Sequence, residues 1–89
     1  EPDSEGATQA AADVEAEARE ELEFVAARVR ALPAELRVPL VLRDVEGWSN
    51  DDVARMLGLS VAATKSRVRR ARMRLRAERE AWSGRRFGS

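Results

Sequence analysis

The chain of 89 residues contains no cysteine and no histidine. Without cysteine, neither a disulfide framework nor a thiolate metal site can form. Without histidine, the chain lacks the usual general base and the commonest zinc ligand. Ser49, Ser60 and Ser66 therefore have no histidine to activate them, which excludes a Ser-His-Asp arrangement. No glycine-rich loop that could cradle a phosphate is present either. We expect a protein that is not an enzyme and that holds no metal and no cofactor.

Long hydrophobic runs are also lacking. No apolar stretch approaches the roughly 20 residues that cross a bilayer. The N-terminus is acidic, whereas a signal peptide needs a basic leading segment. The sequence therefore predicts one small cytoplasmic domain with no membrane partner and no small-molecule substrate.

The net charge of zero hides a strong asymmetry between the two ends. Residues 1–23 carry nine acidic residues and one basic residue, a balance of −8. Residues 61–89 carry ten basic and two acidic residues, a balance of +8. Such an asymmetry is more informative than the total. The basic end suggests a phosphate-bearing partner, and the acidic end suggests either a solvated arm or a contact with a basic partner.

The N-terminal third of the chain changes character at Asp13. Residues 1–12 have no large apolar side chain and are expected to be a disordered acidic arm. Residues 13–32 are expected to form an amphipathic first helix or linker, because apolar residues recur there at spacings of three and four. They are Val14, Ala18, Leu22, Val25, Val29 and Leu32. Pro33 should end this helix and start a second one that runs to about Val45, with a kink at Pro39.

Two further helices are predicted around a glycine turn. Ser49 with Asp52 forms a capping-box pattern, Gly58 suits a left-handed C-terminal cap, and Ser60 caps the last helix. In that helix one stripe is expected to pack, and the basic side chains lie off it. The stripe is Thr64, Val68, Ala71 and Leu75. The predicted fold class is all-α, a small bundle of about four helices.

A helix-turn-helix is expected within residues 33–80, and residues 81–89, with Trp82 and Phe87, are expected to be a flexible tail or to dock on the bundle. A helix-turn-helix with a basic second helix is typical of proteins that read duplex DNA.

Several short motifs lie between Leu32 and Arg72. They are Leu32-Pro33, Arg37, Leu42-Arg43, Glu46-Gly47, Ser49, Val53-Ala54, Leu57-Gly58, Ser60, Lys65-Ser66-Arg67 and Arg70-Ala71-Arg72. Together these motifs resemble region 4 of a bacterial RNA polymerase sigma factor of the extracytoplasmic-function (ECF) type. The resemblance implies recognition of the promoter −35 element, docking on the β flap of RNA polymerase core, and masking by an anti-sigma factor. No region 2 is recognisable, so the chain resembles a C-terminal fragment of a longer protein.

The resemblance also implies roles for individual residues. Ser66, Arg69 and Arg70 would contact DNA bases, since arginine can pair with guanine through two hydrogen bonds. Lys65 and Arg67 would contact DNA phosphates, with pairing to an acid of the bundle as the alternative for Arg67.

The remaining arginines are less specific. Arg37 and Arg43 would either reach DNA phosphates or pair with Asp44 and Glu46. The later arginines of the last helix lie too far along for the same groove, so a solvated face or a polymerase contact is expected. They are Arg72, Arg74, Arg76 and Arg79.

The chain departs from the family pattern just before Lys65. Ala62-Ala63-Thr64 stands where the family usually has Gly-Thr-Val. The hydroxyl of Thr64 would therefore lie on the packing stripe, and we expect it to bond back to a helix carbonyl.

Two other functions fit the same pattern. One is the DNA-binding output domain of a LuxR-like transcription regulator, which reads an operator without engaging polymerase. The other is an interaction module whose helix-turn-helix serves mainly to dock an anti-sigma factor.

Overall fold

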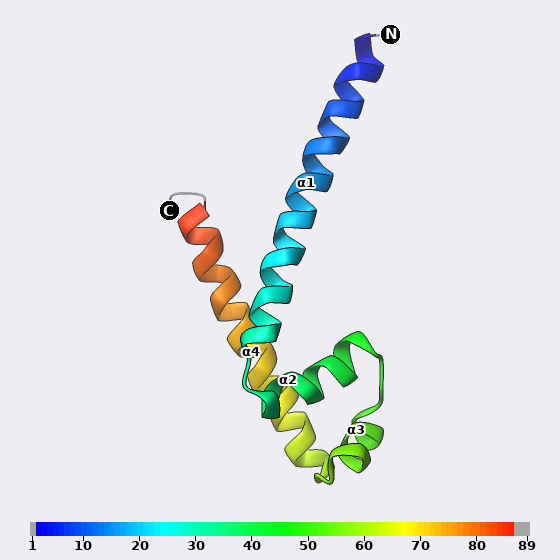
Figure 1. The fold of residues 1–89 in the computed structure, drawn as a ribbon, viewed down its shortest axis with the longest axis vertical. Helices are drawn as coiled ribbons and strands as arrows, with labels where there is room; N and C mark the ends of the chain where they lie inside the picture. The colour runs from blue at the N-terminus through cyan, green and yellow to red at the C-terminus, as the bar shows by residue number, and fades with distance from the viewer. Residues whose placement is uncertain (1, 87–89) are drawn as a thin grey trace.

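The structure, a computed structural model, describes residues 2–86, with side chains from Gln9 to Arg85. Four α-helices and one π-helical turn follow one another in the described chain. They are α1 (Pro2–Ala31), α2 (Ala34–Leu40), the turn η1 (Val41–Val45), α3 (Asn50–Leu57) and α4 (Val61–Arg86). The predicted all-α bundle of about four helices is confirmed. α1 and α4 run antiparallel and are both long, while α2 and α3 sit together at the end opposite the N-terminus (Figure 1).

The core lies where α2 crosses α4 and meets the end of α1. Its buried members are Leu32, Leu36, Leu40, Val68 and Ala71, with Val29 and Leu75 packed against them. Ala71 has no exposed surface, because a small side chain there lets α2 approach α4 closely. The predicted packing stripe of the last helix is confirmed at all four positions, with Leu75 half-buried.

Pro39 marks an irregular stretch of the second helix. Proline lacks a backbone N–H, so one helical hydrogen bond is missing there. Directly after it, η1 widens to π-helical spacing, and the Glu46 N–H bonds to the Val41 carbonyl at 3.0 Å. The irregularity that the sequence predicted at Pro39 therefore appears as a π turn. This turn carries Arg43 and Asp44 toward α4.

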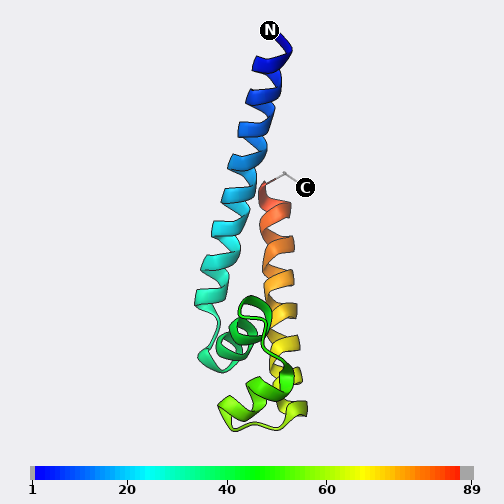
Figure 2. The ribbon, with the colours of Figure 1, turned by 90° about the vertical axis from the view of Figure 1, so that its right-hand side faces the viewer.

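The first helix begins earlier than its amphipathic pattern does. α1 extends back to Pro2, where we expected a disordered arm over residues 1–12. A proline at the first position and a run of alanines suit a helix, since alanine has the highest helix propensity. Of the expected apolar stripe, Val14 is 64% exposed, because the N-terminal part of α1 projects beyond α4 (Figure 2). Leu22 is 69% exposed although its neighbours Glu21 and Phe24 contact α4, so Leu22 faces away from α4. Only the C-terminal half of the stripe is buried in the bundle.

α4 continues as a helix through residues 81–86, so of the two expectations for this segment, a flexible tail or docking on the bundle, the described part follows the second. Trp82 stacks on Phe24 of α1 with ring centroids 4.7 Å apart and planes at 15°. Glu78 lies 3.8 Å from the Arg28 guanidinium, and Arg79 pairs with Glu21. These cross-helix contacts explain why the helix persists. Phe87 lies outside the described residues.

Candidate nucleic-acid interface

The helix-turn-helix is held together by local caps. Ser49 accepts a hydrogen bond from the Asp52 N–H at 3.1 Å and begins α3. Gly58 ends it with φ of +68°, a left-handed conformation that favours glycine. Ser60 then accepts from the Ala63 N–H at 3.0 Å and begins α4. All three predicted caps are confirmed, and together they set the path of the chain from α3 into α4.

Thr64 lies on the buried side of α4, where α4 packs against the rest of the bundle. Thr64 and Val53 of α3 are fully buried, and Ala54 of α3 is buried. The Thr64 hydroxyl donates to the Ser60 carbonyl at 3.0 Å, as the sequence predicted. The hydroxyl is therefore satisfied within its own helix, and the packing between α3 and α4 stays apolar.

The opposite face of α4 presents the residues that we expected to contact bases. Ser66, Arg69 and Arg70 are all exposed. They lie on one side of the helix because residues three and four apart share a face. Lys65 is exposed on one flank and Arg67 is half-buried on the other. The structure thus brings the five residues of α4 together around one face, while their DNA contacts stay predictions.

Arg37 and Arg43 have partners within the protein. Arg37 donates to the carbonyls of Arg30 and Leu32 at 3.1 and 2.9 Å, which are orphan acceptors at the end of α1. Arg43 donates to the Trp48 carbonyl at 3.2 Å and holds the loop before α3. Both arginines donate hydrogen bonds to backbone carbonyls. The ion pairs with Asp44 and Glu46, which were one of the two expectations for them, do not form within the described part of the chain.

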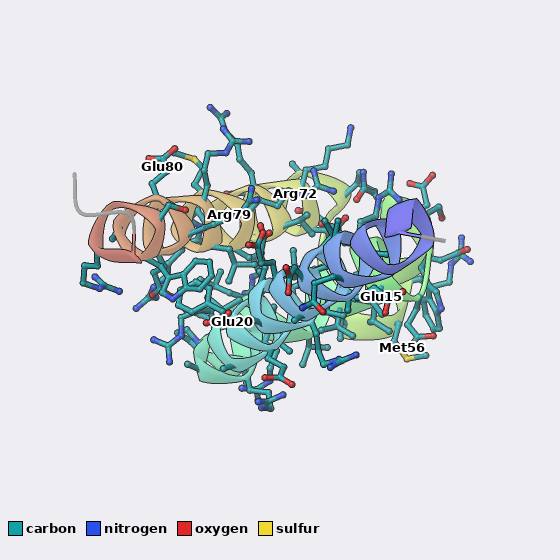
Figure 3. All side chains as sticks on the ribbon, turned by 90° about the horizontal axis from the view of Figure 1, so that it is seen from above. Glu15, Glu20, Met56, Arg72, Arg79 and Glu80 are labelled. Carbon is teal, nitrogen blue, oxygen red and sulfur yellow. The ribbon has the colours of Figure 1, made fainter. Side chains whose placement is uncertain are left out.

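Two arginines that we expected to face solvent or polymerase are instead paired within the protein. Arg72 grips Asp44 of η1 through Nε and Nη2 at 2.8 and 2.5 Å, and Arg79 pairs with Glu21. The hydrogen bonds from Arg72 hold the pKa of Asp44 below its usual value, and the same contact raises the pKa of Arg72. In Figure 3 both Arg72 and Arg79 lie along α4.

The Arg72–Asp44 pair joins residues 28 positions apart, so no local pattern in the sequence marks it. An ion pair between the last helix and an acid of the bundle was considered at Arg67, but it occurs at Arg72. Arg74 and Arg76 are exposed.

Neither a metal site nor a membrane span is found within the described residues. No group of three or more acidic side chains there could hold a metal ion. None of the described helices is both long enough and apolar enough to cross a membrane.

Comparison with known proteins gives one family and several relatives. Residues 25–75, more than half of the chain, match the family model "Sigma-70, region 4". The ECF RNA polymerase sigma factor SigM of Mycobacterium tuberculosis (strain ATCC 25618 / H37Rv) is 50% identical over 44 residues, which are 49% of this chain and 22% of SigM. The ECF RNA polymerase sigma factor SigE of Mycolicibacterium smegmatis is 38% identical over 50 residues, which are 56% of this chain and 20% of SigE. The matched part of the chain thus spans about a fifth of the length of these relatives.

Proposed function

Because the chain belongs to the sigma-70 region 4 family of ECF type, whose members bind the promoter −35 element in transcription initiation, we propose that α4 is its −35 reading helix. The observation that carries this proposal is the exposed face of Ser66, Arg69 and Arg70, directly after the capped turn. A helix presented in this way fits the major groove, with its first turns nearest the base edges.

Within that face, Arg69 and Arg70 contact DNA bases, and the residues on its two flanks contact the DNA backbone. Arg69 and Arg70 can each pair with guanine O6 and N7, worth roughly 1–3 kcal/mol of discrimination. Ser66 is small and can donate to a base. Lys65 and Arg67 on the flanks contact phosphates, which set the register of the helix on the duplex without reading sequence.

Arg37 and Arg43 are kept as secondary phosphate contacts, because each uses only one guanidinium nitrogen in the hydrogen bonds described above. Arginine carries five N–H donors, so both retain capacity for a phosphate. Their contribution to DNA affinity is expected to be smaller than that of Lys65.

The partners follow from the family and are part of the proposal. RNA polymerase core is the first partner, contacted through its β flap, and an anti-sigma factor is a second. The protein acts in the cytoplasm and has no catalytic role of its own. Binding to the isolated β flap separates this function from that of a LuxR-like operator reader. Tight anti-sigma binding without any DNA preference would instead identify a docking module.

The base-reading assignment is tested by Arg70→Ala, with Arg74→Ala as the matched control. Both positions are exposed arginines of α4, but Arg74 lies one turn further from the groove. Preferred duplexes are selected by the full chain in the presence of core RNA polymerase and compared by competition binding. Arg70→Ala should relax preference at one or two positions, at a cost of roughly 1–3 kcal/mol for the preferred base, and Arg74→Ala should leave it unchanged. Equal losses on all sequences for both variants would contradict the assignment.

A further inference from the structure

A small polar hollow lies on the flank of the reading helix, where three elements meet. Its volume is about 100 Å³, and it is lined by Arg43 of η1, Asn50 of α3, and Lys65, Val68 and Arg72 of α4. A water molecule in the liquid takes about 30 Å³. The hollow therefore has room for one tetrahedral oxyanion.

The polar walls of this hollow are held in place from outside it. Asp44 fixes the Arg72 guanidinium through two hydrogen bonds, and the Trp48 carbonyl fixes Arg43. Each arginine keeps further N–H donors beyond those bonds. The N–H donors of Arg43 and Arg72 are therefore available to a ligand in the hollow.

The electrostatics of the hollow favour an anion. Three cationic side chains line it, and Asp44 behind Arg72 is the carboxylate that opposes them, which leaves a local balance of +2. Asn50 is the first residue of α3, so the positive end of that helix faces the same region. Asp51 and Asp52 share this first turn but do not line the hollow.

We propose that Arg43, Asn50, Lys65 and Arg72 form a cradle for one backbone phosphate of the DNA strand that runs beside α4. The inference rests on the proposed function, and it adds Asn50 and Arg72 to the phosphate-contacting set. Lys65 links the cradle to the reading face, because it precedes Ser66 on the same turn. A phosphate held here fixes the register of Ser66, Arg69 and Arg70 against the base edges.

The first test places a negative charge in the cradle by Asn50→Asp. An acidic residue suits the first turn of a helix, so the variant should fold. Ala34→Asp is the matched control, since Ala34 is the exposed first residue of α2 and lies outside the cradle. On a non-specific 30-base-pair duplex at low salt, Asn50→Asp should bind at least about fivefold more weakly than Ala34→Asp, because its charge lies within contact distance of the phosphate.

The second test separates a phosphate contact from a structural role of the Arg72–Asp44 pair. Arg72→Gln and Asp44→Asn both break the pair, but only the first removes the cation. The dependence of log affinity on log salt should become shallower by about 0.9 for Arg72→Gln, and should stay the same or steepen for Asp44→Asn. If the two variants change affinity and salt dependence equally, Arg72 has only a structural role and the cradle is wrong.

The third test identifies the source of the phosphate from the Asn50 side-chain amide signals in NMR spectra. The duplex should shift these signals at phosphate concentrations far below those at which inorganic phosphate does. Equal potency would make the hollow a free-anion pocket and overturn the DNA assignment. Duplex binding that Asn50→Asp leaves unchanged would overturn the cradle alone. Failure of the unaltered chain to bind any duplex, with or without core RNA polymerase, would overturn both the cradle and the proposed function.

Discussion

Thr64 offers a direct test of how the helix-turn-helix is stabilised, through the pair of variants Thr64→Val and Thr64→Ser. Its side chain is fully buried, and its hydroxyl donates to the Ser60 carbonyl at 3.0 Å. The same carbonyl also accepts the Thr64 backbone N–H at 3.0 Å. Removing the hydroxyl therefore leaves no buried acceptor without a donor.

The expected magnitudes follow from this geometry. In Thr64→Val the lost hydrogen bond costs about 0.5–1.5 kcal/mol, and burying an additional methyl returns about 0.8 kcal/mol. The net change in the free energy of unfolding should be below about 1 kcal/mol in either direction. Thr64→Ser keeps the hydroxyl but leaves a methyl-sized cavity, and should destabilise by about 0.5–1.5 kcal/mol. Thr64→Val should thus be tolerated at least as well as Thr64→Ser.

Urea denaturation followed by circular dichroism at 222 nm measures both changes on the full chain. Val14→Thr is the control, because Val14 is exposed and the substitution there should change stability by less than about 0.5 kcal/mol. A loss of more than about 2 kcal/mol in Thr64→Val, together with a Thr64→Ser variant as stable as the parent, would refute the reasoning. It would mean that the hydroxyl, rather than the methyl, holds α4 against α3.

Two further predictions concern contacts that join distant parts of the chain. Trp82→Ala removes the stack on Phe24, which is worth about 0.5–1.5 kcal/mol beyond the buried area. Hydrogen exchange followed by mass spectrometry should therefore become faster for the backbone amides of α1 around Phe24 and stay the same in α3. Unchanged exchange in α1 would show that the stack does not stabilise α1. Arg72 lowers the pKa of Asp44 in the folded state. The pair therefore stabilises the fold at pH above the unfolded-state pKa of Asp44, about 3.9, and this stabilisation is lost as pH falls through the lower folded-state pKa. In Asp44→Asn the free energy of unfolding should therefore fall less steeply as the solution is acidified. The difference should be below about 1 kcal/mol, because both side chains are partly exposed. Identical pH profiles of unfolding for the variant and the parent would contradict this prediction.

The features predicted correctly are those whose cause lies within a few residues along the chain. Ser49, Gly58 and Ser60 act on backbone groups no more than four positions away, so their cap roles are readable from sequence. The back-bond of Thr64 is equally local. The exposed face of Ser66, Arg69 and Arg70 follows from helical periodicity once the opposite stripe is assigned to the core.

The features that sequence reasoning missed depend on segments that meet only in the folded chain. Docking of residues 81–89 on the bundle was one of two expectations, but the sequence did not identify Phe24, 58 positions away, as the residue on which Trp82 stacks. For Arg72 the sequence predicts a solvated face or a polymerase contact, because nothing near it in the chain indicates Asp44 as a partner. Periodicity also placed Val14 in the packing stripe of α1, although the bundle ends before it.

By itself, the sequence determined the helical class, the turn at Gly58, and the basic helix that follows it, because capping, glycine conformation and periodicity are local. Its motifs also indicated membership of the sigma-70 region 4 family. Only the tertiary structure decided which arginines remain available for DNA. It pairs Arg79 with Glu21, holds Arg72 in place through Asp44, and gathers Arg43, Asn50, Lys65 and Arg72 around one hollow beside α4. A count of charges along the chain does not show which way each side chain faces. The packing of α4 against α1 and η1 decides whether a cation of α4 contacts an acidic side chain or remains accessible to DNA.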